Sequence, residues 1–348
     1  MKRRVFIKKL SGWLAAFLVM VGLGGLVYRL FGEDELSPDR QVEEHEVKVG
    51  AENGKGEKEE TKPQDEEKMI PARKLGKTGF SVSLFSLGGE ATVEKSDRAE
   101  EAEAIINRAI DKGVNYIDTA PTYGRGGSES NIGRVMEYRR REVFLATKTG
   151  DRTYDGTLRL VEESLERLRT DYLDLYQLHN VRTTNDLQGA FAENGAVKAL
   201  EELKDQGVIR FTGITGHKDP EVLLQGIKEY PFDCLLMAFN AGDIHYAPFQ
   251  EKLLDEAVKK EMGIIAMKVT AIGRIFRENG LSNMKQALSY VFSFPVSTAI
   301  VGISSEAEVK ENARIASEFE KLSEEDILHL EKLVEPYAGE ANFFKHHW

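Results

Sequence analysis

The fold is decided by a strand and a helix that follow each other in residues 143–169. The strand is the mostly apolar run VFLATK at residues 143–148, and the helical pattern TLRLVEESLERLR follows at residues 157–169. Within that pattern, Leu158, Val161 and Leu165 recur at three- and four-residue steps, which places them on one face. A buried strand that leads into an amphipathic helix is the repeating unit of a parallel sheet covered by helices.

The same alternation extends to both sides of this unit. Eight strands are predicted, most of them uninterrupted apolar runs, at residues 82–87, 114–118, 143–148, 173–179, 211–216, 234–240, 263–268 and 297–301. Helical patterns lie between them, for instance at residues 157–168, 196–206, 221–228, 249–261 and 284–292. Eight such units in a chain of this length predict an α/β fold of the (β/α)8 type, a TIM barrel. A doubly wound sheet is the competing fold, but LGGE at residues 87–90 lacks its G-x-G-x-x-G fingerprint.

Two further segments flank the predicted barrel. The string RKLGKTG at residues 73–79 has the turn composition of a small hairpin, which we expect to plug the N-terminal mouth of the barrel. Residues 323–337 predict a last helix, because Ser323 and Asp326 have the spacing of a capping box.

The first residues of the chain predict a membrane segment. Five basic residues lie between Met1 and Lys9, and residues 10–27 are uncharged and mostly apolar. A helix of that length spans about 27 Å, close to the roughly 30 Å hydrocarbon core of a bilayer. Basic residues before the span and acidic residues after it predict that the body lies outside. We therefore expect residues 1–31 to be retained as an anchor, with cleavage as a signal as the alternative.

The string KRRVFIK at residues 2–8 also resembles a twin-arginine export signal, whose machinery moves folded proteins. An ordinary signal anchor with a chance arginine pair is the alternative. The body is accordingly predicted to be anchored to the membrane or exported, on the extracytoplasmic side. A cytoplasmic body is the alternative.

An acidic segment separates this N-terminal part from the barrel. Residues 33–68 hold 14 acidic and 6 basic side chains and no aromatic residue. Such a composition cannot bury enough apolar surface to fold, so residues 32–68 are predicted to be a disordered linker, with an interaction tail as the alternative. Residues 69–348 then form the barrel domain. The net charge of −11 argues against a nucleic-acid partner.

The composition also bears on cysteine chemistry and metal binding. Cys234 is the single cysteine, and its apolar surroundings predict a buried, unreactive thiol. The seven histidines show no spacing typical of a metal site, so no metal is expected.

Polar residues at the ends of consecutive strands mark the expected active site. Asp118 ends the second predicted strand, Tyr123 follows it in the loop, Lys148 ends the third strand and His179 ends the fourth. In a (β/α)8 barrel such residues converge at the C-terminal face. Each one alone has an ordinary structural explanation, such as capping, loop packing or reaching solvent.

Together these four residues fit the reduction of a carbonyl. A carbonyl that receives a hydride also needs a proton on its oxygen, and Tyr123 can be the general acid if a nearby cation lowers its pKa. Lys148 is the expected cation, and Asp118 would pair with its buried ammonium group. His179 would donate a hydrogen bond to the carbonyl oxygen or help to relay the proton.

This order of residues resembles the catalytic tetrad of the aldo/keto reductase family. The surrounding strings GVNYIDTA (113–120), FLATK (144–148) and YLDLYQLH (172–179) resemble that family too, and the resemblance extends over residues 74–337. It implies an NAD(P)-dependent oxidoreductase that acts on an aldehyde, ketone or sugar carbonyl. A regulatory or redox-sensing barrel with little turnover, attached to the membrane, is the alternative. A metal-dependent hydrolase is disfavoured, since no further metal-binding residues join Asp118 and His179.

The resemblance also implies a nicotinamide cofactor that lies across the barrel mouth. The residues that would bind it are Thr215, Gly216, Asn240, Lys268, Gly302, Ser304, Ser305, Glu308 and Asn312. NADP is expected as the cofactor, and NAD is the alternative, because Ser304 stands where the family often has a basic residue for the 2′-phosphate. Helix capping would equally explain Ser304 and Ser305.

The loops at residues 180–195 and 269–283 are long enough to carry substrate specificity. Arg182, Arg274 and Arg277 lie in these loops and suggest an anionic substrate.

Overall fold

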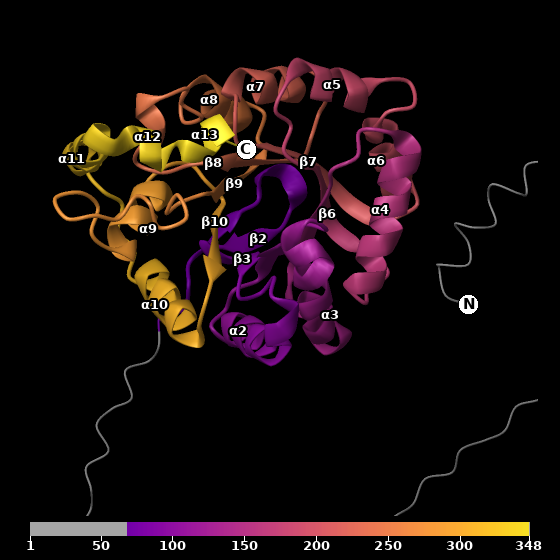
Figure 1. Cartoon of the computed structure of the whole chain (residues 1–348), viewed down its shortest axis with the longest axis horizontal. Helices are drawn as coiled ribbons and strands as arrows, with labels where there is room; N and C mark the ends of the chain where they lie inside the picture. Colours follow the sequence, from indigo (N-terminus) through magenta and orange to yellow (C-terminus); the bar gives the residue numbers. More distant parts are fainter. Residues whose placement is uncertain (1–67, 348) are drawn as a thin grey trace, which may run out of the picture. The chain divides into compact units, whose positions relative to one another are not determined.

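Eight parallel strands close into a barrel in the computed structural model, which describes residues 68–347. Each strand pairs with the next, and the last pairs with the first. The predicted (β/α)8 barrel is thus confirmed (Figure 1). The strands are β3 (Phe85–Ala91), β4 (Tyr116–Asp118), β5 (Phe144–Thr149), β6 (Leu173–Leu178), β7 (Ile209–Gly216), β8 (Cys234–Ala238), β9 (Gly263–Met267) and β10 (Thr298–Ile303).

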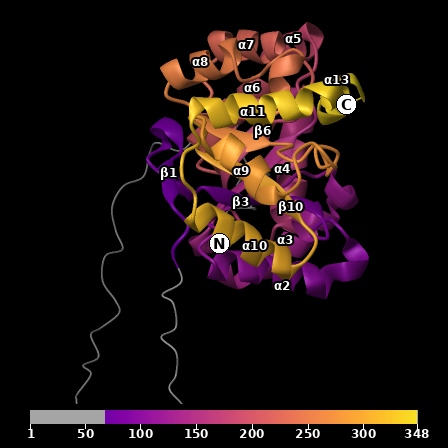
Figure 2. The same ribbon diagram turned by 90° about the vertical axis from the view of Figure 1, so that its left-hand side faces the viewer.

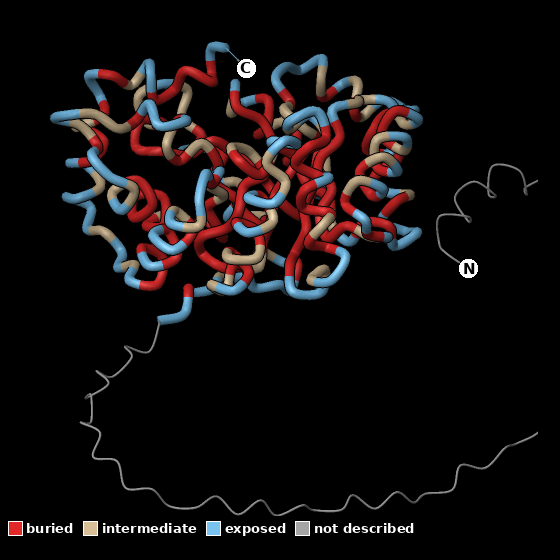
Figure 3. The backbone as a smooth tube through the Cα atoms, turned by 60° about the horizontal axis from the view of Figure 1, so that its bottom comes forward, coloured by how far each residue is buried: buried red, intermediate tan, exposed pale blue. Residues whose placement is uncertain are grey.

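Helices surround this barrel and bury its outer face, so that the buried segments lie inside and the exposed ones at the periphery (Figure 3). The five helices predicted from sequence are confirmed to within a few residues. The helices are α2 (Ala99–Asp111), α3 (Gly127–Arg139), α4 (Tyr154–Arg167), α5 (Thr184–Phe191), α6 (Ala196–Asp205), α7 (Pro220–Glu229), α8 (Lys252–Lys259), α9 (Met284–Phe292), α10 (Glu306–Ser317) and α11 (Glu324–Val334).

The first predicted strand, residues 82–87, combines two different elements and is wrong in its bounds. Its beginning belongs to β2 (Ser81–Ser83), which pairs antiparallel with β1 (Ala72–Lys74) outside the barrel. The barrel strand β3 starts at Phe85 and continues to Ala91. It continues through two glycines because the strands approach closely there: a Cβ atom on Gly88 would lie 3.2 Å from the backbone nitrogen of Gly302.

The β1–β2 hairpin closes the N-terminal end of the barrel, as predicted from residues 73–79. Leu75 and Val82 are fully buried in one cluster with Tyr116 and Phe144, the first residues of β4 and β5. Cys234, the first residue of β8, belongs to the same cluster, and burial raises the pKa of its thiol. The hairpin thus fills the end opposite the strand ends that carry the polar residues. The buried position predicted for Cys234 is confirmed.

The chain ends in helices that pack along the barrel. The capping box predicted at Ser323 and Asp326 is present at the start of α11. After α11 come two short helices, α12 (Ala338–Ala341) and α13 (Phe343–His347). In Figures 1 and 2 the yellow C-terminal segment starts between α8 and α9. The sequence after Pro336 carried no prediction, and the structure shows that it contributes the buried residue Lys345.

Lys345 forms a buried ion pair with the loop after β8. Its Nζ atom lies 2.5 Å from Oδ1 of Asp243 and donates to the backbone carbonyl of Tyr246 at 2.5 Å. The other carboxylate oxygen of Asp243 accepts from the backbone N–H groups of Phe249 (2.8 Å) and Gln250 (3.0 Å). Both side chains are almost completely shielded from solvent. The last helix is therefore attached to the barrel by a charge pair and not only by apolar contact.

Helix α3 packs tightly on α4, and this contact gives a first prediction. A Cβ atom on Gly133 would lie 2.1 Å from the carbonyl oxygen of Arg167, a backbone atom that has little freedom to move. We expect Gly133→Ala to lower the free energy of unfolding by about 1–3 kcal/mol, since forced overpacking has that cost. Gly339→Ala is the control, because its Cβ would meet no atom within 4 Å. Equal urea midpoints for the two variants would contradict the tight contact.

The N-terminal predictions fall outside the described residues. No helix within residues 68–347 is long and apolar enough to cross a membrane. The membrane segment at residues 1–31, the twin-arginine signal within it and the linker at residues 32–68 all precede the described barrel, apart from Lys68. They therefore stay predictions.

Candidate active site

The four predicted catalytic residues come together at the C-terminal end of the barrel. Asp118 is the last residue of β4, Lys148 is the last residue but one of β5, and His179 directly follows β6. Tyr123 begins a short 3-10 turn (Tyr123–Gly126) after β4. Because neighbouring parallel strands end at the same rim, side chains from three strands reach one small volume.

Lys148 is the centre of this group. Its Nζ atom forms an ion pair with Oδ1 of Asp118, donates to the carbonyl oxygen of Thr119 at 2.8 Å and lies 3.5 Å from the hydroxyl of Tyr123. Lys148 and Asp118 are both fully buried. The predicted pairing of the ammonium group with Asp118 is therefore confirmed, and the pair holds the cation next to the phenol.

A fifth residue, Gln177, supports the group and was missed by sequence reasoning. Its Nε2 atom donates to Oδ2 of Asp118 at 2.9 Å, and the hydroxyl of Tyr116 lies 3.5 Å from the same oxygen. Gln177 is fully buried, and its Oε1 atom has no hydrogen-bond partner. The signal was a polar residue inside the apolar strand β6, two positions before His179.

The supporting hydrogen bond leads to a second prediction. Gln177→Glu replaces the N–H donor by a carboxyl oxygen next to Asp118 and should lower the free energy of unfolding by about 2–3 kcal/mol at pH 8. Burial and the neighbouring carboxylate raise the pKa of the new group above its unfolded value. The loss should therefore be smaller at pH 5, where the new group is protonated, and grow as the pH rises.

Urea unfolding at the two pH values measures this effect. The control is Gln188→Glu, because Gln188 is exposed on α5. A loss that does not depend on pH would mean that Gln177 fills space and does not hold Asp118.

The surroundings shift the pKa of Tyr123 upward and the pKa of His179 downward. Burial and the carboxylates Glu90, Asp118 and Glu94 raise the pKa of Tyr123 well above its usual value. The net shift is therefore upward and not the lowering expected from Lys148, because burial and the three carboxylates outweigh the cation. Burial and the cation Lys148 hold the pKa of His179 well below its usual value, so its imidazole is uncharged at neutral pH.

The rings of Tyr123 and His179 face the same space. Their centroids are 6.0 Å apart and the rings are nearly perpendicular, at 85°. Both side chains line a cavity of about 340 Å³, whose other lining residues are Glu90, Asn180, Arg182, His217 and Lys268. The protonated phenol and the neutral imidazole thus point at one site that a small molecule can reach.

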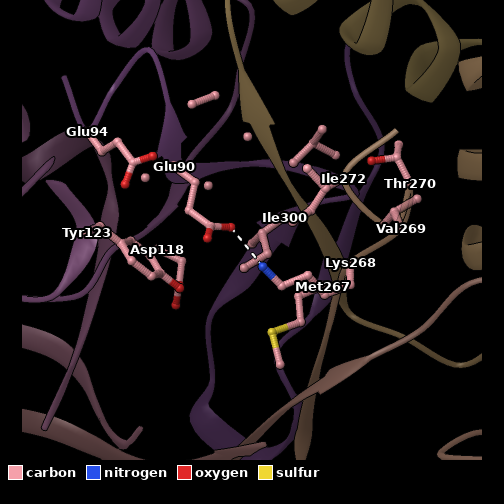
Figure 4. Close-up of a pocket in the computed structure, with 15 residues that line it drawn as sticks. Glu90, Glu94, Asp118, Tyr123, Met267, Lys268, Val269, Thr270, Ile272 and Ile300 are labelled. Carbon is pink, nitrogen blue, oxygen red and sulfur yellow. Dashed lines mark hydrogen bonds and ion pairs between the residues drawn. The ribbon is translucent and has the colours of Figure 1, made fainter. Parts of the chain in front are cut away.

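A second cavity of about 300 Å³ extends from Tyr123 and Asp118 to the ends of β3, β9 and β10. Figure 4 shows Tyr123, Asp118 and Glu94 on one side of it, and Lys268, Val269 and Thr270 on the other. Lys268 donates to Oε2 of Glu90 at 3.0 Å across this cavity, and its side chain is only 6% exposed. Burial lowers the pKa of Lys268, and Glu90 opposes that shift.

The predicted cofactor-binding residues are distributed over this end of the barrel. Lys268 and Gly302 line the 300 Å³ cavity. Thr215 and Gly216 are the last residues of β7, and Thr215 is buried. A Cβ atom on Gly216 would lie 2.6 Å from the carbonyl oxygen of Val181, so close packing accounts for this glycine.

Asn240 has a structural environment of its own. Its Nδ2 atom donates to the carbonyl oxygens of Lys268 (3.1 Å) and Ala341 (3.3 Å), and its Oδ1 atom accepts from the N–H of Gly242 (2.8 Å). The side chain therefore joins the loop after β8 to the strand end at Lys268 and to the C-terminal helices. It does not line either of the two cavities.

The remaining predicted residues surround the start of α10. Ser305 is the N-cap residue and accepts from the N–H of Glu308, whose carboxylate accepts from the N–H of Ser304 at 2.8 Å. Asn312 is buried in the second turn of the same helix. The helix-capping explanation of Ser305 is thus confirmed. The binding roles of these residues stay predictions.

The comparisons with known proteins agree with this geometry. The sequence pattern described as "Aldo/keto reductase family" matches residues 84–279. The chain is 30% identical over 297 residues to the uncharacterized oxidoreductase YqkF of Bacillus subtilis, which covers 73% of this chain and 94% of that protein. It is 27% identical over 311 residues to L-galactose dehydrogenase of Arabidopsis thaliana, with 77% and 95% covered.

A solved structure adds the fold. The holo form of aldo-keto reductase AKR11C1 from Bacillus halodurans superposes with a TM-score of 0.66 at 27% identity, over 76% of this chain and 96% of that chain. The family match at residues 84–279 includes Asp118, Lys148 and His179. The chain therefore belongs to the aldo/keto reductase family, whose members are NAD(P)-dependent oxidoreductases.

Proposed function

We propose that the barrel reduces an aldehyde, ketone or sugar carbonyl with Tyr123 as the proton donor. The observation that carries the proposal is the phenol of Tyr123 at 3.5 Å from the buried ammonium group of Lys148, in a cavity it shares with His179. The nicotinamide cofactor of the family supplies the hydride when it is bound. Tyr123 would donate its proton to the carbonyl oxygen, so that the reduced carbonyl leaves as an alcohol.

The residues of the chain have separate tasks in this reaction. The raised pKa of Tyr123 keeps the phenol protonated before the transfer, and the nearby ammonium group of Lys148 stabilises the phenolate left after it. Asp118 holds Lys148 in place. The neutral imidazole of His179 can donate one hydrogen bond to the carbonyl oxygen without a competing charge.

The cofactor fits the residues present at the C-terminal end. Gly88, Gly89 and Gly302 line the 300 Å³ cavity and have no side chains to fill it. Only backbone lies at these points, which leaves room for a flat ring system. Lys268 and Gly302 from the predicted set line the same cavity, and Ser304 and Ser305 follow Gly302 along the chain. NADP is the proposed cofactor, with NAD as the alternative because Glu306 and Glu308 make the start of α10 acidic.

A titration tests the proposal. The purified full-length chain is titrated with NADPH and separately with NADH, and a reactive aldehyde is then added while the absorbance at 340 nm is followed. We expect binding and then oxidation of the nucleotide. Binding without oxidation of any of several aldehydes would favour the alternative of a cofactor-binding sensor, and no binding of either nucleotide would overturn the proposal.

For the N-terminal residues we propose membrane attachment of an extracytoplasmic barrel. The apolar run at residues 10–27 and the arginine pair at residues 3 and 4 support this, by way of the twin-arginine machinery. A cofactor carried in the folded barrel would then need re-reduction by a second substrate. Protease added to intact cells should digest the barrel, whereas digestion only after the membrane is opened would show a cytoplasmic body.

A further inference from the structure

The cavity shared by Tyr123 and His179 is lined by polar and ionisable side chains only. Its lining residues are Glu90, Tyr123, His179, Asn180, Arg182, His217 and Lys268, and none of them is aliphatic. Cavities that bind small molecules are usually lined mainly by apolar and aromatic side chains. An apolar aldehyde would have to strip water from these polar groups without replacing the lost hydrogen bonds, which is costly. The cavity therefore favours a hydrophilic molecule.

The charges in this cavity do not balance. Glu90 is neutralised by Lys268 at 3.0 Å, and Asp118, which does not line this cavity, is neutralised by Lys148. Arg182 is exposed at the rim, and within residues 68–347 no carboxylate forms an ion pair with its guanidinium group. With Glu90 as the one carboxylate against the two cations Lys268 and Arg182, the lining carries a net positive charge.

The cations of the cavity also act on its two imidazoles. Burial lowers the pKa of His217 to about 3, and the charged groups that add to this shift are the cations Lys268, Lys148 and Arg182. After burial, the pKa of His179 is lowered by Lys148, His217, Arg152 and Lys268. Lys148 and Lys268 thus act on both rings. An anionic group would be stabilised in this region.

We infer that the substrate is a hydroxylated carbonyl compound that carries a carboxylate, as a sugar acid does. This inference rests on the proposed function, since the carbonyl oxygen lies at Tyr123 and His179. The guanidinium group of Arg182 binds the carboxylate in the two-pronged geometry that arginine favours. Glu90, Asn180 and Lys268 line the same cavity and would exchange hydrogen bonds with the hydroxyl groups. The Glu90–Lys268 pair offers both an acceptor and a donor.

A matched pair of sugars tests the inference with the full-length chain. D-Glucuronate and D-glucose differ only at C6, where the first has a carboxylate and the second a hydroxymethyl group. We expect kcat/KM to be about ten- to hundredfold higher for glucuronate, which is the range for one hydrogen-bonded charge. Arg182→Gln should bring this ratio close to one. Arg159→Gln is the control, since Arg159 is an exposed residue of α4 that lines neither cavity, and should leave the ratio unchanged.

A binding measurement separates this inference from the proposed function. D-Gluconate has the carboxylate but no carbonyl, and D-sorbitol lacks both. Gluconate should raise the melting temperature of the full-length chain more than sorbitol does, and Arg182→Gln should remove the difference. If the chain reduces a small aldehyde such as glyceraldehyde, but kcat/KM is equal for glucuronate and glucose, the inference is overturned. The proposed function is then left intact. Selective gluconate binding without reduction of any aldehyde would overturn the proposed function instead.

Discussion

Tyr123→Phe should lower kcat/KM for carbonyl reduction by about 10²–10⁴-fold, the usual contribution of a general acid. The hydroxyl that is removed lies 3.5 Å from Lys148, and no other phenol lines the two cavities. The ring of Tyr123, which packs edge-on against His179, is retained in phenylalanine. The change is therefore chemical and not steric, and the fold should be unaffected.

Nucleotide binding distinguishes loss of the acid from loss of the site. The dissociation constant for the reduced cofactor, measured by its fluorescence, should change by less than about threefold, since less than 1 kcal/mol of binding is at stake. Tyr138→Phe is the matched control, because Tyr138 is exposed on α3. Near-normal turnover by Tyr123→Phe would mean that another group donates the proton, and His179 would then be the first candidate.

Lys345→Met should lower the free energy of unfolding by about 3–5 kcal/mol, the cost of leaving one partner of a buried ion pair without the other. Asp243 is fully buried, and burial already raises the pKa of its carboxyl group while Lys345 opposes the shift. Without the ammonium group, only backbone N–H groups from Phe249 and Gln250 would remain to stabilise the charge.

The double variant Lys345→Met/Asp243→Asn should recover part of this loss, because the uncompensated charge is gone. Urea unfolding of both single variants and the double variant gives the coupling energy of the pair. Lys260→Met is the control, since Lys260 pairs with Glu256 on the outer surface of α8 and such pairs contribute about 0–1 kcal/mol. A double variant whose loss relative to the wild type equals the sum of the two single losses would show that the pair is not coupled.

The sequence predicted the barrel because its signals are local. Each strand is a short apolar run and each helix has one apolar face, so that VFLATK at residues 143–148 already implies burial on both sides. The four catalytic candidates could be found because topology alone brings strand ends together. The start of β3 was misplaced because Val82 is as apolar as a barrel residue. Val82 instead belongs to the β1–β2 hairpin.

What the sequence did not predict depends on contacts between distant residues. Nothing in the string FFKHH indicates that Lys345 is buried, because its partner Asp243 lies about a hundred residues earlier. The direction of the pKa shift of Tyr123 could not be predicted for the same reason. Its pKa depends on three carboxylates, and Glu90 and Glu94 reach it from a different strand and loop. Gln177 was visible as a polar residue in an apolar run, but its partner was not.

The pairing of β10 with β3 also has a consequence for folding during synthesis. A ribosome releases Phe85 long before Ala299, which lies opposite it in the finished sheet. Until then the edge of β3 has no neighbour on that side, and Asp243 lacks its ammonium partner until Lys345, 102 residues later, has been made. Long-range strand pairing is slow, and open strand edges can associate with other chains. The incomplete barrel therefore depends on chaperones or on rapid synthesis of the remaining strands. The ring closes only after β10 has been made, and the charge of Asp243 is matched only after Lys345 has followed.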